Sequence, residues 1–401
     1  MTSPGTTRAV GLLIAARGVR AFADGLVSVV LPAHLLALGM SAFEIGAIFT
    51  ATLVGAAIVT LGIGLYGGAW SRRAIALWGC VAIALTGAAM VPAESFWLIL
   101  LLAVVGTLNP SVGDVGMFLP MEQARLADIV ENDRRTTVFA RYSLVGALAG
   151  AAGTLSAPVP EMLGIALRFT FLLYIAVAVV LAAIYSAVPL GEPPARAAGA
   201  GAPALSAQSR RPILILTSLF CLDAFGGGFV LQSLLALWLF DRFDLSVADA
   251  ARALFVMGVL GAFSHLAAPW VARRLGIINT MVFTHLPANL FLMATPFAPT
   301  LEIALVLLFL RSALSSMDVA PRTSLIVLLV PPHERAAATS VAAVPRSLAA
   351  AGAPVVAGAL LAATPFGWSL VVGGALKALY DVLLLVAGRR LARERGVRDF
   401  R

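Results

Sequence analysis

The chain has 401 residues, of which 60% are hydrophobic and only 12% are charged. Soluble domains average roughly 45–50% apolar and 25% charged residues, so this composition excludes a soluble protein and predicts one embedded in a lipid bilayer. The net charge of +8 does not indicate a nucleic-acid partner, because the basic residues fall in loops between apolar segments. The cysteines Cys80 and Cys221 lie in apolar runs without C-x-x-C spacing. We therefore expect no disulfide, no metal site and no cofactor.

Apolar stretches of about 20 residues, the length that crosses a bilayer as a helix, recur along the whole chain. Twelve are expected, and the glycines and prolines inside them are tolerated in membrane helices. The first shows no cleavage pattern after it, so we interpret it as a transmembrane helix and not as a removed signal. The expected spans are residues 9–37, 43–67, 73–92, 96–120, 136–158, 162–188, 212–239, 248–271, 275–295, 300–322, 335–362 and 366–388.

The arginines divide unevenly between alternate loops. Loops on one side hold only Arg242 and Arg252, with Arg168 just inside the sixth span. The opposite side, which includes both termini, holds Arg8, Arg72, Arg73, Arg125, Arg134, Arg135, Arg196, Arg210, Arg211, Arg273, Arg274, Arg322, Arg335, Arg389, Arg390, Arg393, Arg395, Arg398 and Arg401. The positive-inside rule places that side in the cytoplasm. We expect both termini there, in a bacterial inner membrane.

The two halves of the chain resemble each other. Asp114-Val115 recurs as Asp318-Val319 at an offset of 204, and Ser41-x-x-Glu44 recurs as Ser246-x-x-Asp249 at 205. Each of the latter pairs is a capping box that opens a helix. Residues 190–211 are rich in proline, alanine and glycine, which is typical of a linker. The sequence therefore predicts an N-terminal six-helix bundle (1–189), a cytoplasmic linker (190–211) and a C-terminal six-helix bundle (212–401), which are related by a parallel duplication.

Twelve spans, cytoplasmic termini, a central linker and basic pairs after spans two and eight resemble the major facilitator superfamily (MFS). The loop Gly64-Leu-Tyr-Gly-Gly68-Ala-Trp-Ser-Arg72-Arg73 is similar to the family's G-x-x-x-D-R-x-G-R-R pattern, with Gly68 in the place of the aspartate. The resemblance covers essentially the whole chain. It implies an all-α fold of two pseudo-symmetric bundles in which helices 1, 4, 7 and 10 line a central cavity.

Those four helices carry the clearest charges within apolar runs. Arg17, Arg20 and Asp24 share a face of the first span, and a separate stripe of glycines that includes Gly25 is expected to face a neighbouring helix. On a continuous tenth helix Arg311, Ser315, Asp318 and Arg322 lie within about 40° of one another. A charge at mid-membrane usually faces a cavity or a partner charge. Asp223 occupies the repeat position of Arg20, which predicts an ion pair between the halves.

Depth along the helices predicts two layers. The central layer, which would bind the substrate or a proton, holds Arg20, Asp24, Asp223 and Arg311. Within it we expect Asp24 to be the proton-coupling carboxylate and Arg20 its modulator. The inner layer would be a gate in which Asp114 pairs with Arg141 and Asp318 pairs with Arg346.

Other polar residues have a simpler interpretation. We interpret His265, His285, Lys377 and Asp381 as local packing or interhelical bonds, and Asn109-Pro110 as a kink in the fourth span.

These patterns predict a secondary transporter that works by alternating access, most simply by proton-coupled export (antiport) of a small organic compound. The alternative is a transporter of an organic or inorganic anion held by Arg20 and Arg311. A receptor or scaffold without transport activity is less well supported, because long soluble segments are missing. Neither an H-E-x-x-H motif nor a nucleotide-binding P-loop is present, so an enzyme is not expected. We expect a monomer with a small-molecule substrate, protons as the coupling ion, and no nucleic acid.

Overall fold

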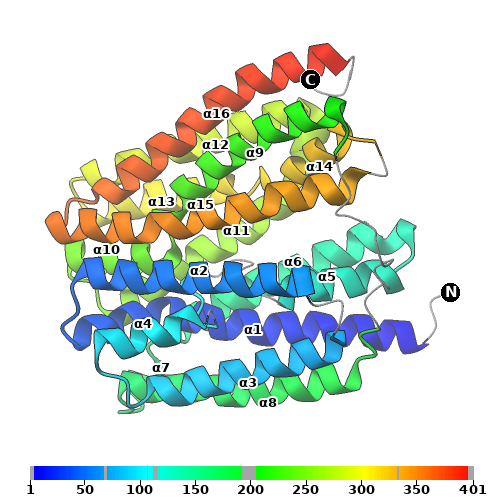
Figure 1. The fold of residues 1–401 in the computed structure, drawn as a ribbon. Helices are drawn as coiled ribbons and strands as arrows, with labels where there is room; N and C mark the ends of the chain where they lie inside the picture. The colour runs from blue at the N-terminus through cyan, green and yellow to red at the C-terminus, as the bar shows by residue number, and fades with distance from the viewer. Residues whose placement is uncertain are drawn as a thin grey trace. The chain divides into compact units, whose positions relative to one another are not determined.

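The computed structural model describes residues 4–66, 70–105, 107–111, 116, 118–191, 205–331 and 334–395. Within these residues the regular structure is helical (Figure 1). Ten helices of this part are long and apolar enough to cross a membrane. The two other predicted spans, 96–120 and 300–322, are each interrupted.

The chain divides into two compact units. Unit 1 is Met1–Arg196 with Gln232–Phe255, and unit 2 is Ala197–Leu231 with Val256–Arg401. Unit 1 thus includes one helix, and the first turns of another, from the half predicted to be the second bundle. The predicted linker lies mostly outside the described residues, and the predicted bundle limits stay a prediction.

The helices of unit 1 are α1 (Pro4–Ala37), α2 (Ala42–Tyr66), α3 (Arg72–Met90), α4 (Phe96–Val104), α5 (Phe118–Ile129), α6 (Asn132–Leu155), α7 (Val159–Met162), α8 (Leu173–Ala187), α10 (Gln232–Phe243) and the start of α11 (Val247–Leu275). Those of unit 2 are α9 (Ala207–Gly228), the rest of α11, α12 (Ile277–Ala294), α13 (Leu301–Ser315), α14 (Val319–Leu329), α15 (Arg335–Ala363) and α16 (Trp368–Arg395). Short 3₁₀ turns at Leu167–Leu172 and Thr295–Phe297 join neighbouring helices.

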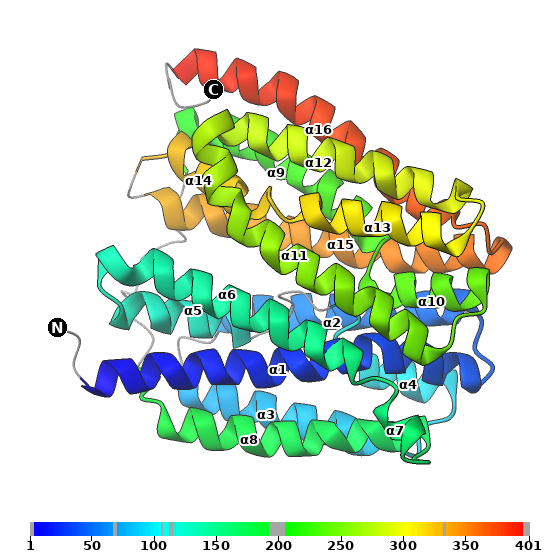
Figure 2. The same cartoon turned by 180° about the vertical axis from the view of Figure 1, so that it is seen from behind.

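The same helix pairs recur in the two units. In unit 1, α1 packs along α6 and α3 along α8 (Figures 1 and 2). In unit 2, α9 packs along α15 and α12 along α16. These are the first with the fifth and the third with the sixth helix of each predicted repeat. Such recurrence is what a duplicated six-helix unit produces.

Glycine allows the closest of these contacts. A Cβ added to Gly25 of α1 would lie 1.9 Å from the carbonyl oxygen of Gly150 in α6. In unit 2, a Cβ on Gly228 of α9 would lie 2.4 Å from the carbonyl oxygen of Ala350 in α15. In lipid no hydrophobic effect drives helices together, so they associate through close packing, and small residues let their backbones approach in this way. The prediction that the glycine stripe of the first span faces a neighbouring helix is confirmed at Gly25.

The predicted capping box at Ser41 forms with both of its bonds, and the one at Ser246 forms with its serine cap. The backbone N–H of Ser41 donates to Glu44 Oε2 at 2.8 Å, and that of Glu44 donates to Ser41 Oγ at 3.3 Å. In the second half, the N–H of Asp249 donates to Ser246 Oγ at 3.1 Å. These bonds satisfy backbone donors at the start of α2 and α11 that have no partner within the helix.

The fourth predicted span is not one helix with a kink, as the sequence suggested. Helix α4 ends at Val104 and α5 begins at Phe118. In the intervening segment Asn109 Oδ1 accepts the N–H of Ser111 at 3.0 Å, a side-chain turn that competes with helix formation. Pro110 has no N–H to donate, and its carbonyl accepts the N–H of Ser233 of unit 1 at 3.1 Å.

The tenth predicted span is also broken. Helix α13 ends at Ser315, and α14 begins at Val319 after a three-residue turn. Pro321 explains the break, because within a continuous helix its ring would clash with the carbonyl four residues earlier. At the third position of α14 proline is tolerated, since the first N–H groups of a helix have no partner within it. The single polar face that we predicted from Arg311 to Arg322 is therefore wrong.

Candidate functional site: buried ion-pair networks

The first network lies in unit 1 around Glu122 of α5, which is fully buried. Arg20 of α1 binds it with both terminal nitrogens, Nη1 to Oε1 at 3.0 Å and Nη2 to Oε2 at 2.8 Å. Tyr185 of α8 donates to Oε1 at 2.5 Å, and Tyr142 of α6 donates to Oε2. The guanidinium also lies 4.9 Å from the centre of the Phe118 ring. A bidentate pair with two further donors is the arrangement that a buried carboxylate needs, and it is electrically neutral.

Asp24 lies one helical turn beyond Arg20, next to a small cavity of unit 1. Asn109 Nδ2 donates to Asp24 Oδ2 at 3.1 Å. The cavity has a volume of about 40 Å³, the size of one or two water molecules. It is lined by Arg20, Asp24, Thr107, Asn109, Phe118 and Tyr174, among others. The buried hydroxyl of Tyr174 lies beside the backbone of Asn109. The break between α4 and α5 thus creates a mainly apolar pocket into which a few polar side chains, Asp24, Thr107 and Asn109, are gathered.

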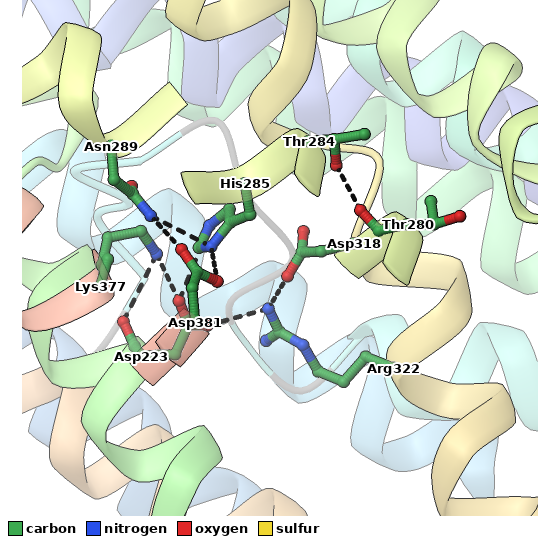
Figure 3. A network of polar contacts seen from close by, with 9 residues as sticks. All are labelled: Asp223, Thr280, Thr284, His285, Asn289, Asp318, Arg322, Lys377 and Asp381. Atoms are coloured by element: carbon green, nitrogen blue, oxygen red, sulfur yellow. Dashed lines mark hydrogen bonds and ion pairs between the residues drawn. The ribbon is translucent and has the colours of Figure 1, made fainter. Parts of the chain in front are cut away.

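The second network lies in unit 2 around Asp223 of α9 (Figure 3). Lys377 of α16 lies 2.6 Å from Asp223 Oδ1, and Arg322 of α14 lies 2.8 Å from Oδ2. Arg322 also pairs with Asp318, which precedes α14. Asp223 therefore ties α9 to both α14 and α16.

A histidine and a third carboxylate extend this network toward α12. His285 Nδ1 lies 2.8 Å from Asp381 Oδ1 of α16, and Asn289 Nδ2 donates to Asp381 Oδ2 at 2.8 Å (Figure 3). On its other side His285 Nε2 lies 3.8 Å from Asp223 Oδ1. His285 thus stands between two carboxylates. The side chains of His285, Asp381 and Asp223 are 2%, 0% and 3% exposed, so bulk water screens these charges little.

The buried charges of this network do not cancel unless it holds a proton. Asp223, Asp318 and Asp381 are three carboxylates, whereas Arg322 and Lys377 are two cations. Neutral His285 leaves one negative charge in excess, and protonated His285 removes it. Because an uncompensated buried charge is costly, the arrangement is suited to taking up one proton.

Two predicted site arginines stand apart from these networks. Arg311 is half-buried, and its Nε is enclosed without a hydrogen-bond partner in the described part of the chain. Arg346 of α15 has an exposed side chain, although it is near enough to Asp223, Asp318 and Arg322 to interact electrostatically with them. Either arginine offers hydrogen-bond donors to an anion.

The structure corrects two predicted pairings. The predicted ion pair between Arg20 and Asp223 is replaced by other pairs. Arg20 pairs with Glu122, and Asp223 pairs with Lys377 and Arg322. Asp318 pairs with Arg322, four residues along the same segment, and not with Arg346. The short local distance favours this partner. Asp114 lies outside the described residues, so its pairing with Arg141 stays a prediction.

Sequence reasoning missed the central residue of the first network. Glu122 falls beyond the expected end of the fourth span at residue 120, because the span was counted as one uninterrupted helix. Lys377, Asp381 and His285 form interhelical bonds, as predicted. Within the described residues no cluster of three or more metal-ligating side chains is present.

Comparisons with known proteins agree with this architecture. The sequence model of the Major Facilitator Superfamily matches residues 13–317. A Saccharomyces cerevisiae protein described as an uncharacterized membrane protein is 24% identical over 94% of this chain and 93% of its own length.

Solved structures share the fold at low identity. A bacterial homologue of the human lysosomal transporter Spinster, in an inward-facing and occupied conformation, has a TM-score of 0.72 and 15% identity, covering 99% of this chain and 98% of its own. The nucleoside transporter NupG has a TM-score of 0.71 and 14% identity, covering 95% and 99%. The human organic anion transporter MFSD10 has a TM-score of 0.59 and 18% identity, covering 95% and 100%.

Proposed function

Because the chain belongs to the major facilitator superfamily, a family of membrane transporters, we propose that it exports a small organic compound in exchange for protons by alternating access. Membership makes the chain a transporter and not an enzyme, as the sequence predicts. ATP is not its energy source, because the chain's single lysine, Lys377, follows leucine and so cannot complete a P-loop G-K-[ST] motif. An ion gradient and the gradient of the substrate itself are the remaining sources of drive, and the buried charges described below favour the first.

The excess carboxylate in the buried network of unit 2 carries the proton-coupling part of this proposal. Among the buried side chains, two cations and a histidine balance Asp223, Asp318 and Asp381 only when one proton is bound; Arg346, which interacts with Asp223 and Asp318 from an exposed position, is not counted among them. Alternating access changes the hydration of such a site, so its proton affinity differs between the two states. A site of this kind can take up a proton on one side of the membrane and release it on the other.

Asp24 is a second candidate for the coupling group, and its surroundings also suit substrate binding. The small cavity beside it lies where α4 and α5 are interrupted, and α13 and α14 are interrupted at the corresponding place in unit 2. Interrupted helices at matching positions of two repeats commonly mark the binding region of a transporter. We keep Arg20, Asp24, Asp223 and Arg311 as the proposed central layer. Asp114, Arg141, Asp318 and Arg346 remain the proposed gate, with Asp318 paired to Arg322 and not to Arg346 in the state that this structure represents.

Transport of an organic or inorganic anion is the second candidate function. Arg311 supports it, because its guanidinium has an enclosed nitrogen without a partner in the described part of the chain. Arg20 supports it less, since Glu122 already neutralises it. One structural neighbour is named as an organic anion transporter, but at 18% identity that likeness shows the fold alone.

The proposed setting is a bacterial inner membrane, with both termini in the cytoplasm and the protein acting as a monomer. The arginine-rich alternate loops support this orientation.

Transport by purified protein in proteoliposomes tests the proposal. A thermal-shift screen of a nucleoside (uridine), an organic anion (p-aminohippurate) and an organic cation (1-methylnicotinamide) selects the probe, because a ligand of the folded state raises the Tm. Antiport predicts accumulation of the probe in vesicles that are acidic inside. Accumulation only in vesicles that are acidic outside would indicate symport and contradict export. Stabilisation by p-aminohippurate that is lost in Arg311→Gln would favour the anion alternative.

A further inference from the structure

His285 has the geometry of a proton-binding group with two different partners. Its Nδ1 is held by Asp381 at 2.8 Å, whereas its Nε2 faces Asp223 Oδ1 at 3.8 Å, too far for a hydrogen bond (Figure 3). Asn289 donates to the other oxygen of Asp381. Asn289 Nδ2 also lies 3.2 Å from His285 Nδ1, but the shorter contact of 2.8 Å with an ionised Asp381 places the imidazole proton on Nδ1. The lone pair of a neutral His285 then lies on Nε2, directed toward Asp223.

Lys377 and His285 approach the same oxygen atom. Lys377 Nζ lies 2.6 Å from Asp223 Oδ1 and His285 Nε2 lies 3.8 Å from it. An N–H on Nε2 would need a movement of about 1 Å to reach hydrogen-bond distance. Once there, it would compete with the lysine for this oxygen, while Arg322 keeps Oδ2. The contact between α9 and α16 is therefore the one most sensitive to the charge on His285.

The surroundings of His285 include charged groups on every helix packed against α12 or Asp223. Those that contact or interact with His285 or its partners are Asp223 on α9, Asp318 and Arg322 at the start of α14, Arg346 on α15, and Lys377, Tyr380 and Asp381 on α16. Helix α13, which also packs against α12, carries Glu302 and Arg311. Tyr380 meets the His285 ring edge-on, with 6.0 Å between ring centres. The two carboxylates nearest the ring are Asp381 and Asp223.

We propose that His285 is the residue that binds the coupling proton, with Asp381 positioning its Nδ1 and Asp223 receiving its Nε2. This inference rests on the proposed proton-coupled function and names the group responsible. The proton comes from water as hydronium, an N–H bond forms at the Nε2 lone pair, and no electrons are transferred to or from the protein. In the proton-loaded state Nε2–H donates to Asp223 Oδ1 and weakens the ion pair of Lys377. Proton binding thereby loosens α16 from α9.

Histidine NMR on the purified protein tests the binding step without any substrate. The chain has four histidines, so the variant His34→Gln/His265→Gln/His333→Gln retains only His285. With ¹⁵N-labelled imidazole we expect Nδ1–H in the neutral form and protonation of Nε2 as the pH is lowered. Asp381→Asn in the same background should remove the preference for Nδ1–H. Absence of Nε2 protonation in the folded protein, or an unchanged tautomer in Asp381→Asn, would overturn the proposal.

A pH step applied to proteoliposomes on a solid-supported membrane tests the coupling. Wild-type protein should give a transient charge displacement, which His285→Gln loses. His265→Gln is the matched control, because His265 is exposed on α11 and outside the network, and it should keep the displacement. A full displacement in His285→Gln refutes this inference but leaves proton coupling intact. A wild-type protein without displacement refutes the proposed coupling, and the NMR titration then still decides whether His285 binds a proton.

Discussion

Replacing Glu122 by glutamine removes the charge at the centre of the unit 1 network while keeping the shape of the side chain. Glu122 accepts four hydrogen bonds, two from Arg20 and one each from Tyr142 and Tyr185. A glutamine amide has only one acceptor oxygen, so it loses at least two of these bonds and leaves Arg20 buried without a counter-charge. Breaking a buried pair in this way costs about 3–5 kcal/mol. For a unit of this size that corresponds to a fall in Tm of roughly 6–20 °C.

A thiol-reactive fluorophore measures this change in unit 1 alone. Cys80 is 3% exposed in α3, so its thiol becomes reactive when the unit opens, and Cys221→Ala removes the second thiol. Glu94→Gln is the matched control, because its carboxylate is 73% exposed and lies 3.8 Å from an exposed Arg168. Its expected effect is about 0–1 kcal/mol.

A double-mutant cycle separates the stranded charge from lost packing. Adding Arg20→Gln to Glu122→Gln should recover part of the loss, because neither charge is then buried alone. The reasoning is refuted when Glu122→Gln lowers the Tm no more than Glu94→Gln does. Equal losses in the single and double variants would show that the charge of Arg20 is not what makes Glu122 necessary.

Three further predictions concern topology, coupling and packing. A reporter fused after Arg401 should be cytoplasmic and one inserted at residues 241–249 should be outside, as alkaline-phosphatase activity would show; the opposite result reverses the orientation. Asp24→Asn should abolish gradient-driven transport but spare substrate exchange if Asp24 shares the coupling, and full gradient-driven transport would make it a structural residue. Gly25→Ala should prevent folding, because its Cβ would lie 1.9 Å from a backbone oxygen of α6, whereas Gly11→Ala, with nothing within 4 Å, should keep or slightly raise the Tm.

The class of fold could be predicted from the amino-acid sequence alone. The apolar stretches, the arginine asymmetry and the repeated dipeptides predict a duplicated helical membrane protein, and the family match and the recurring helix pairs agree with that prediction. The reason is physical: in a bilayer each helix must satisfy its own backbone groups. The length of a membrane helix and its apolar composition are properties of one continuous segment, so they can be read from the sequence of that segment. The capping boxes at Ser41 and Ser246 were predictable for the same reason.

The two helix breaks are marked in the sequence by prolines, which were not considered when the membrane spans were counted. Pro120 and Pro321 each occupy the third position of the helix that follows a break, α5 or α14. Proline at this place starts a helix well but interrupts one that is already running. Including this rule would have extended the fourth span beyond residue 120 and brought Glu122 into it.

Which charged side chains pair with each other could not be predicted from the sequence, because it depends on how the helices pack. From the sequence, the candidate partners of Arg20 were Asp24 on its own helix and Asp223 at its repeat position. In the structure Arg20 pairs with Glu122, which is 102 residues away along the chain. His285 and Asp381, which are 96 residues apart, likewise meet because α12 packs along α16. A long side chain reaches several partners within a few ångströms, and the choice depends on helix rotation and on which donors satisfy a buried carboxylate together. Those are properties of the packed bundle, and no spacing along the chain contains them.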